Sequence, residues 1–184
     1  MTLIVWILLA LVVLVVIIFI SYYNRFVVLG NRIYNSLSQI DVQLKRRADL
    51  IPNLISTVKA FAKHEKSIME SVTKARAAMI SAKGLPEKMK ANNVLENALG
   101  KLFAIAENYP QLRANENFLE LQRELSSTED KVAYSRQFYN DSILSYNNMC
   151  QKFPGNIFAN MYGKKPKEYL KIVEAEKKVV KVEF

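Results

Sequence analysis

The stretch RRADLIPNL, Arg46 to Leu54, decides the fold, because a proline interrupts what otherwise reads as one long amphipathic helix. Proline removes one intrahelical hydrogen bond and crowds the preceding turn. Two structures satisfy this stretch. Either Pro52 kinks a continuous helix, or Asp49 caps a new helix that carries Pro52 in its first turn. The choice between them sets the number of long helices.

Apolar residues recur around this stretch at alternating steps of four and three, from Ile33 to Ala82. Thirteen of the fifteen positions are apolar, which predicts a long helix with one packed stripe, here called the seam. The seam keeps its phase across Pro52, and this favours a kink or two abutting helices without a real loop. The positions are Ile33, Leu37, Ile40, Leu44, Arg47, Ile51, Leu54, Val58, Phe61, Glu65, Ile68, Val72, Ala75, Met79 and Ala82.

The two polar positions of the seam are Arg47 and Glu65. They lie about 27 Å apart along a straight helix, so we expect each to find a partner on another helix, because a buried unpaired charge is costly. Such pairs set register or oligomeric state. The alternative is a side chain at the edge of the seam that reaches water, favoured for Arg47 because arginine is long. The candidate partners are Glu124 or Glu129 for Arg47, and Arg76 or Arg136 for Glu65.

Two further helices follow the seam. Gly84 suits the residue after a helix and Pro86 restarts one, so we expect a second helix over about 87–108, closed by Pro110. Its expected apolar residues are Val94, Leu95, Leu99, Leu102, Phe103 and Ile105.

The third long helix is expected between AENYPQL (106–112) and FPGN (153–156). Its seam combines a row of large residues with an alternate row that contains small hydroxyl residues. Small residues let a neighbouring helix approach, and hydroxyls bond back to the preceding turn. The large positions are Phe118, Leu125, Val132, Tyr139, Tyr146 and Phe153, and the alternate positions are Leu121, Thr128, Ser135, Ser142 and Met149.

The N-terminus contains eighteen consecutive apolar residues, from Leu3 to Ile20. They cover roughly 27 Å as a helix, close to the ~30 Å hydrocarbon core of a bilayer. Tyr22 and Tyr23 follow, where an interfacial aromatic belt lies. A cleaved signal peptide fits poorly, because no basic segment precedes the run and no small-x-small site follows it. We expect a retained membrane span, with the lipid bilayer as a partner.

The charge distribution around this span predicts its orientation. No Lys or Arg precedes the apolar run, whereas Arg25 and Arg32 follow it. The positive-inside rule therefore predicts a single-pass membrane protein with the N-terminus outside and the helical bundle in the cytoplasm.

Composition and motifs exclude several classes of protein. One cysteine, Cys150, and one histidine, His64, exclude a disulfide framework and a multi-cysteine zinc site, and we expect Cys150 to be a buried, inert thiol. No phosphate-binding glycine loop, GxSxG or HExxH is present. We expect no catalytic residue, cofactor or metal. A net charge of +9 indicates anionic partners, but nucleic acid is disfavoured because no RNP, helix-turn-helix or zinc-finger pattern accompanies the basic tail.

Long ordered segments along nearly the whole chain carry a resemblance to one known family. The segments are YNSL (34–37), DVQLKRRADLIPNLISTVKAFAKHE (41–65), VTKARAA (72–78), AENYPQLRANENFLELQRELSSTEDKVAYSRQFYND (106–141) and SYNNMCQKFPGNIFANMYG (145–163). They resemble the LemA family of bacterial membrane-anchored proteins, and this implies a helical bundle on a single anchor in the bacterial inner membrane, without enzymatic activity, cofactor or substrate. A relative of the family belongs to the machinery that shapes bacterial magnetosome membranes, which implies a membrane-organising role.

These observations predict an all-α protein of three parts. Residues 1–28 form the transmembrane anchor and interfacial segment, and residues 29–153 form an antiparallel coiled-coil-like bundle. Residues 154–184 form a lysine-rich tail, and we assign no structure to its last six residues, VVKVEF. The bundle has three long helices, or four if the first is broken near Pro52.

The functional hypothesis is a non-enzymatic scaffold that self-associates, or binds an unidentified protein, and thereby organises the membrane. Arg46, Arg47, Asp49 and Pro52 would form a structural joint between the anchor-side stalk and the bundle. One alternative is a monomeric adaptor or regulator of a membrane protease or signalling system. Another is lipid or nucleic-acid binding through the basic tail.

Overall fold

The computed structural model describes residues 2–170, which form two compact units. Unit 1 comprises residues 2–37 and 137–170, and unit 2 comprises residues 38–136. The described residues contain no strand, so the predicted all-α class is confirmed. Their helices are α1 (Thr2–Phe61), α2 (Lys66–Ser81), α3 (Leu85–Ala106), α4 (Pro110–Arg113), α5 (Glu116–Gln151) and α6 (Gly155–Met161).

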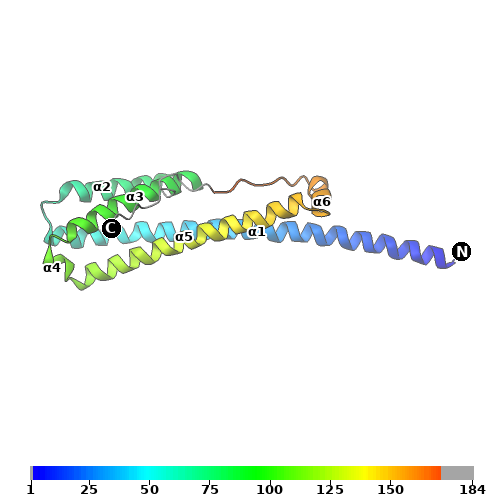
Figure 1. Cartoon of the computed structure of the whole chain (residues 1–184), viewed down its shortest axis with the longest axis horizontal. Helices are drawn as coiled ribbons and strands as arrows, with labels where there is room; N and C mark the ends of the chain where they lie inside the picture. The colour runs from blue at the N-terminus through cyan, green and yellow to red at the C-terminus, as the bar shows by residue number, and fades with distance from the viewer. Residues whose placement is uncertain (1, 171–184) are drawn as a thin grey trace, which may run out of the picture. The chain divides into compact units, whose positions relative to one another are not determined.

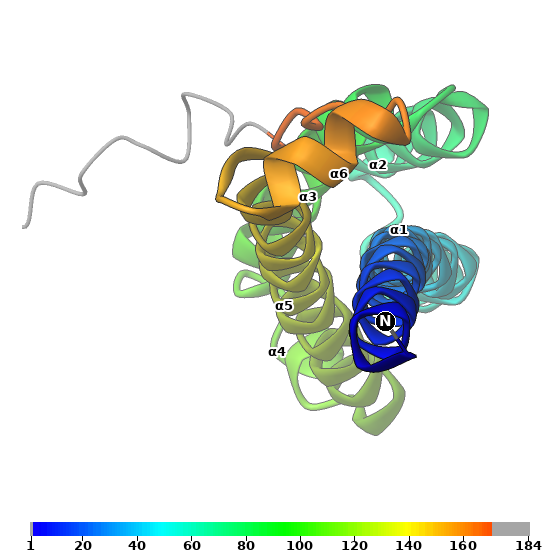
Figure 2. The ribbon, with the colours of Figure 1, turned by 90° about the vertical axis from the view of Figure 1, so that its right-hand side faces the viewer.

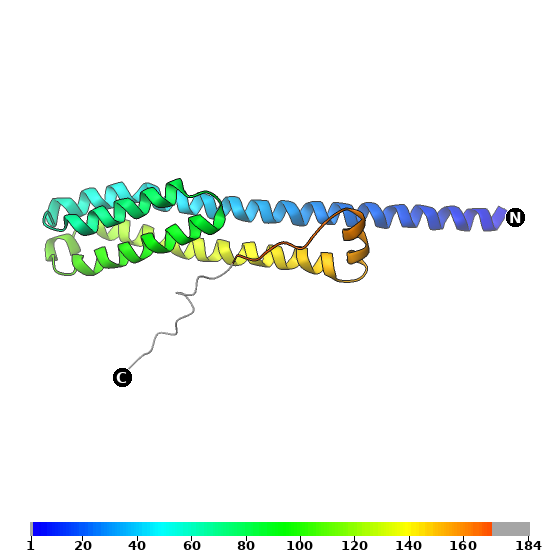
Figure 3. The same ribbon diagram turned by 90° about the horizontal axis from the view of Figure 1, so that it is seen from above.

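Unit 2 is a bundle of four helices in which each long helix runs antiparallel to the one before it (Figure 1 and Figure 3). The helices are α1 from residue 38, α2, α3, and α5 as far as residue 136, and the single turn α4 connects α3 to α5. Their apolar stripes meet in one core. The buried apolar residues are Ile40, Leu44, Ala48, Ile51, Leu54, Val58 and Ala62; Ile68, Met69, Val72, Ala75 and Met79; Met89, Leu95, Ala98, Leu99, Leu102 and Ala106; Leu112; and Phe118, Leu125 and Val132.

The fourth helix arises at a place that the seam did not predict. Helix α1 continues through Pro52, so Asp49 lies in mid-helix and is not an N-cap. The expected continuity to Ala82 is wrong, because the chain turns at residues 62–65 and α2 begins at Lys66. Ala62 takes the buried position, with 1% of its surface exposed, and the predicted seam residue Phe61 is 37% exposed.

Helix α1 tolerates Pro52 because a neighbouring helix replaces the missing donor. In an uninterrupted α-helix the N–H of residue 52 would donate to the carbonyl of Ala48, and proline has no N–H. The Nε of Arg76, on α2, donates to this Ala48 oxygen at 2.7 Å. A guanidinium donor therefore satisfies a buried carbonyl that the proline leaves open.

Unit 1 contains the N-terminal part of α1, the end of α5, and α6, which runs across the direction of α5 (Figure 2). Gly163, with φ +64°, ends α6, and the N–H of Lys164 donates to the Ala159 carbonyl at 2.8 Å, as in a Schellman cap. Cys150 is buried, as expected. The buried core consists of Phe26, Ile33, Ile143, Tyr146, Cys150 and Ala159.

The segment after α6 is extended and is held on α5 by two asparagines. The Asn147 side chain donates to the Lys167 carbonyl and accepts from the Lys167 N–H, both at 2.8 Å. Asn140 makes the same pair of bonds with Leu170, at 3.2 and 2.9 Å. Each carboxamide supplies the donor and the acceptor that a neighbouring β-strand would otherwise provide to an extended backbone. The first part of the predicted lysine-rich tail is thus α6 and a bound strap, and residues 171–184 lie outside the described residues.

The predicted rows of α5 are largely confirmed. Thr128 and Ser142 are buried, and their hydroxyls donate back to the carbonyls of Leu125 and Phe138, each at 2.7 Å. Phe153 is 80% exposed, against the prediction, because α5 ends at Gln151 before the row reaches it. The domain boundaries after residues 28 and 153 stay predictions.

Candidate functional site

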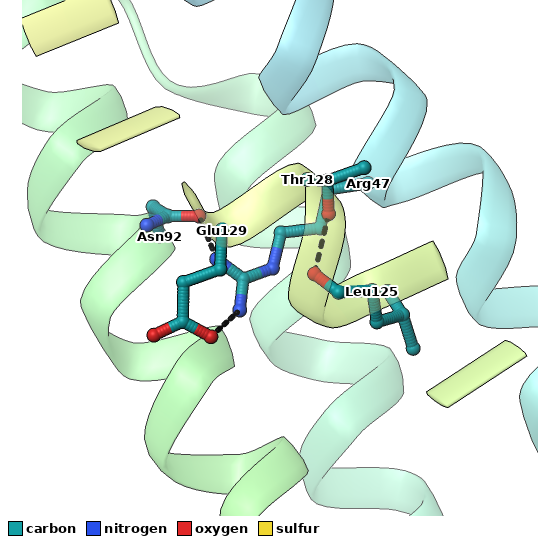
Figure 4. Close-up of polar contacts among 5 residues, drawn as sticks. All are labelled: Arg47, Asn92, Leu125, Thr128 and Glu129. Carbon is teal, nitrogen blue, oxygen red and sulfur yellow. Dashed lines mark hydrogen bonds and ion pairs between the residues drawn. The ribbon is translucent and has the colours of Figure 1, made fainter. Parts of the chain in front are cut away.

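The polar centre of unit 2 is Arg47, whose side chain is 2% exposed (Figure 4). Its Nη1 donates to Oδ1 of Asn92, on α3, at 3.1 Å, and its Nη2 lies 3.5 Å from Oε2 of Glu129, on α5. Glu129 was one of the two partners considered from the sequence. The interpretation of Arg47 as an edge side chain that reaches water is wrong, because the guanidinium is enclosed among three helices.

The charge of Arg47 is only partly compensated within unit 2. Burial lowers the pKa of the Arg47 guanidinium, while the carboxylates of Glu129 and Glu96 act to raise it. Half of the Glu129 side chain is solvent-exposed, and the Arg47 Nε has no hydrogen-bond partner among the described residues. Arg47 is therefore a buried cation fixed by one amide and one partly screened carboxylate, and its role in setting register stays a prediction.

Three consecutive residues of α1 contact all three other long helices of unit 2. Arg46 forms an ion pair with Glu124, on α5, at 2.6 Å, and Arg47 reaches α3 and α5. The Ala48 carbonyl accepts the bond from Arg76, on α2. Residues 46–48 thus form a polar hub of the bundle that includes the predicted joint residues Arg46 and Arg47, whereas Asp49 and Pro52 are exposed. Their role as a joint stays a prediction.

Glu65, the other polar seam residue, has a partner that sequence reasoning missed. The hydroxyl of Tyr109 donates to Oε1 of Glu65 at 2.9 Å, and joins the α1–α2 turn to the segment between α3 and α4. This hydrogen bond is the largest cause that raises the pKa of the Tyr109 hydroxyl. Arg76, a predicted partner of Glu65, donates to Ala48 instead. A tyrosine after an expected helix end carries no charge pattern that could have signalled the contact.

The predicted membrane segment lies in the part of α1 that belongs to unit 1. The helix is long and apolar enough to cross a bilayer, and its side chains are exposed from Leu3, at 74%, to Ile20, at 53%. Tyr22 stacks on Phe158 of α6 with ring centroids 4.3 Å apart, and Tyr23 packs edge-on against Tyr162 at 5.5 Å. The expected aromatic belt therefore packs against Phe158 and Tyr162, two residues that the sequence analysis had assigned to the lysine-rich tail.

The described residues offer little for catalysis by a metal. Within residues 2–170, no group of three or more His, Cys, Asp or Glu side chains is placed to hold a metal ion. The expectation that the chain has no catalytic residue and no cofactor stays a prediction.

The LemA family model matches residues 36–184, which is most of the chain and begins after the apolar segment. This chain belongs to the LemA family. Together with the apolar N-terminal part of α1, membership of the family indicates a membrane-associated helical protein.

Individual relatives of known name share low sequence identity with this chain. Magnetosome protein MamQ 1 of Paramagnetospirillum magneticum is 28% identical over 173 residues, with 80% of this chain and 64% of the relative covered. MamQ of Magnetospirillum gryphiswaldense matches with the same identity and coverage. Protein LemA of Metamycoplasma hominis is 25% identical over 132 residues, covering 70% of this chain and 59% of the relative. The LemA-family chain thus spans less than two thirds of the length of these curated relatives.

Proposed function

We propose that this chain is a non-enzymatic, single-pass membrane protein whose helical bundle acts as a scaffold for self-association or partner binding, and so organises the bilayer. The observation that carries the proposal is the continuity of α1. The apolar segment and the helix that holds the polar hub of unit 2 are one helix, Thr2–Phe61, without an intervening loop. Similarity to proteins named for the magnetosome supports the membrane-organising part.

The proposed orientation places unit 2 in the cytoplasm. Its basis is the asymmetry of charge, since Arg25 and Arg32 follow the apolar segment and no basic residue precedes it. Protease treatment of sealed inside-out membrane vesicles tests this orientation. Unit 2 should be digested without detergent, and its survival until detergent is added would refute the assignment.

The scaffold proposal predicts a defined assembly larger than the 21.1 kDa monomer. The measurement is the particle mass of the full-length chain in mild detergent and in lipid nanodiscs. Variants of one exposed helix locate the surface: Ile80→Lys should lower the mass, because this α2 side chain is apolar and 58% exposed. Ser71→Lys, at an exposed polar position of the same helix, is the control with the same charge change. A monomer at every concentration would contradict self-association.

The second candidate is a monomeric adaptor, and one feature of unit 2 favours it. An open groove of about 660 Å³ lies between α3 and α5, with Arg47 at its base. Gly100, Ala104 and Ser126 line it with small side chains, which leave room for a partner segment. A monomeric mass together with a specific crosslink from this groove in cells would support the adaptor.

A further inference from the structure

Unit 1 contains a basic pocket next to the end of the apolar segment. It has a volume of about 390 Å³ and lies between α1 and the end of α5. Its size is in the range of ordinary small-molecule sites. Its lining combines basic and polar side chains with the apolar side chains of Leu29, Met149 and Phe153. The polar residues of the wall are Tyr22, Arg25, Arg32, Ser145, Asn148 and Lys152.

The positive charge of this pocket is uncompensated within the described residues. Arg25 and Arg32 are seven residues apart and share one face of α1, and Lys152, which directly follows α5, lines the pocket with them. Among residues 2–170, no carboxylate lies within ion-pair distance of any of the three. Unit 1 as described has six basic residues and only two acidic ones, Asp141 and Glu168. The pocket is therefore complementary to an anion.

The position of the pocket along α1 selects the kind of anion. Tyr22 follows the apolar run by two residues, and Arg25 lies about 7.5 Å beyond Ile20 along the helix axis. The headgroup layer occupies roughly 5–8 Å outside the hydrocarbon core on each side. Arg25 is thus at the depth of lipid phosphates, and long basic side chains deeper in the pocket can extend toward it.

Helix α6 supplies an apolar surface at the same depth. The Tyr162 hydroxyl donates to the Phe19 carbonyl at 2.7 Å and so ties α6 to the last turn of the apolar run. On α6, Ile157 and Met161 are 49% and 62% exposed, and Phe153, two residues before the helix, is 80% exposed. Large apolar side chains at an interface insert among acyl chains near the headgroups.

A close backbone approach holds α6 in this place. A Cβ on Gly155 would lie 2.3 Å from the Met149 carbonyl oxygen, so only glycine allows the chain to turn there from α5 into α6. Gly155 also lines the pocket, and the turn therefore builds both the basic cavity and the apolar surface next to it.

We propose that this pocket binds the phosphodiester headgroup of an anionic phospholipid, with α6 lying in the membrane interface beside it. Arg25 and Lys152 pair with the phosphate, and Arg32 extends the positive field. The Ser145 hydroxyl donates to the Asp141 carbonyl at 2.9 Å, which leaves its oxygen free to accept a bond from a hydroxylated headgroup. The site requires the membrane placement proposed above but not self-association, so the lipid and mass measurements can fail independently.

Lipid selectivity of the full-length chain tests this site. The protein is reconstituted in nanodiscs that mix phosphatidylglycerol with phosphatidylcholine, and the lipids that stay bound after extraction into mild detergent are counted by native mass spectrometry. The pocket variant is Arg25→Gln/Lys152→Gln. The control is Lys164→Gln/Lys165→Gln, which removes the same charge from unit 1 outside the pocket. Circular dichroism checks that both variants remain helical, since all four residues are on the surface.

The expected result is enrichment of phosphatidylglycerol in the wild type and the control, reduced about tenfold or more in the pocket variant. Equal losses in both variants would reduce the effect to general charge attraction and overturn the site. Absence of enrichment in the wild type would also overturn it. Inorganic phosphate that displaces the bound lipid at millimolar concentration would show a site for free phosphate instead of a lipid.

Discussion

Residues 46–54 and residues 61–66 both interrupt the same apolar seam, the first with a proline and the second with a run of polar residues. Helix α1 continues through the first segment and ends in the second. At the first, Arg76 supplies a donor to the Ala48 carbonyl, and apolar side chains on both sides stay buried. At the second, Phe61 is no longer buried and the backbone closes a turn on itself, with the Glu65 N–H donating to the Ala62 carbonyl at 3.2 Å.

The comparison shows that tertiary contacts decide where this helix ends. A lost backbone hydrogen bond costs little when a neighbouring helix replaces it, so a proline alone does not end α1. The chain turns at residues 62–65 without glycine or proline, because the next seam position, Glu65, is polar and its burial would not stabilise a longer helix. The contacts of the polar hub, residues 46–48, distinguish the first segment from the second. Each of these contacts can be removed separately by mutation.

The largest expected effect is that of Arg47→Ala. The change opens a cavity and leaves the buried Asn92 amide without its donor, so the free energy of unfolding should fall by about 3 kcal/mol. Urea unfolding of the full chain in mild detergent, followed by far-ultraviolet circular dichroism, measures this. Arg46→Ala is the control, because its ion pair with Glu124 is solvent-exposed and should contribute below about 1 kcal/mol.

Equal losses for the two neighbouring arginines would contradict the assignment of Arg47 as the buried centre of unit 2. A further variant separates charge from packing: Arg47→Met/Asn92→Leu removes both polar groups and should recover most of the lost stability.

The next effect concerns Pro52 itself. Arg76→Met should cost about 1.5 kcal/mol in the wild type, because the Ala48 carbonyl loses a charged donor. In the Pro52→Ala background the cost should be about 1 kcal/mol smaller, since alanine has the backbone N–H that proline lacks. A double-mutant cycle from the same unfolding curves gives this coupling. Additive effects would mean that Arg76 does not compensate for the proline.

Much of the fold follows from the period of the apolar residues. The seam from Ile40 to Val58 is buried, and both the helix end before Gly84 and the hydroxyl row of α5 were predicted from spacing and composition. The turn at residues 62–65 was not predicted, because the apolar residues of α2 happen to continue the four–three spacing of α1 across it. Constant phase therefore does not demonstrate a continuous helix when the intervening residues are polar.

The polar contacts were predictable only in part. Glu129 was a candidate partner of Arg47 because opposite charges must meet in a buried seam. The Ala48 carbonyl could have been recognised from Pro52, four residues later, as an acceptor without its donor. Its partner could not, because the pairing of α1 with α2 depends on the missed turn. The contacts of α6 were missed for a related reason: a helix of seven residues that begins within FPGN is too short to show a period.

The smallest expected effect tests the second interruption, through Tyr109→Phe, which removes the bond from Tyr109 to Glu65 beside the α1–α2 turn. The loss should be smaller than for Arg76→Met, because the contact is partly exposed. The raised pKa of Tyr109 fixes its pH dependence. The bond stabilises the fold fully below the ordinary tyrosine pKa of about 10, and the contribution disappears as pH rises through the raised value. The difference in unfolding free energy between wild type and variant should therefore be constant near neutral pH and shrink in alkali. A difference that grows with alkaline pH would show that the tyrosinate, not the hydroxyl, is favoured in the fold, and would remove the bond to Glu65 as the reason that the turn is stable.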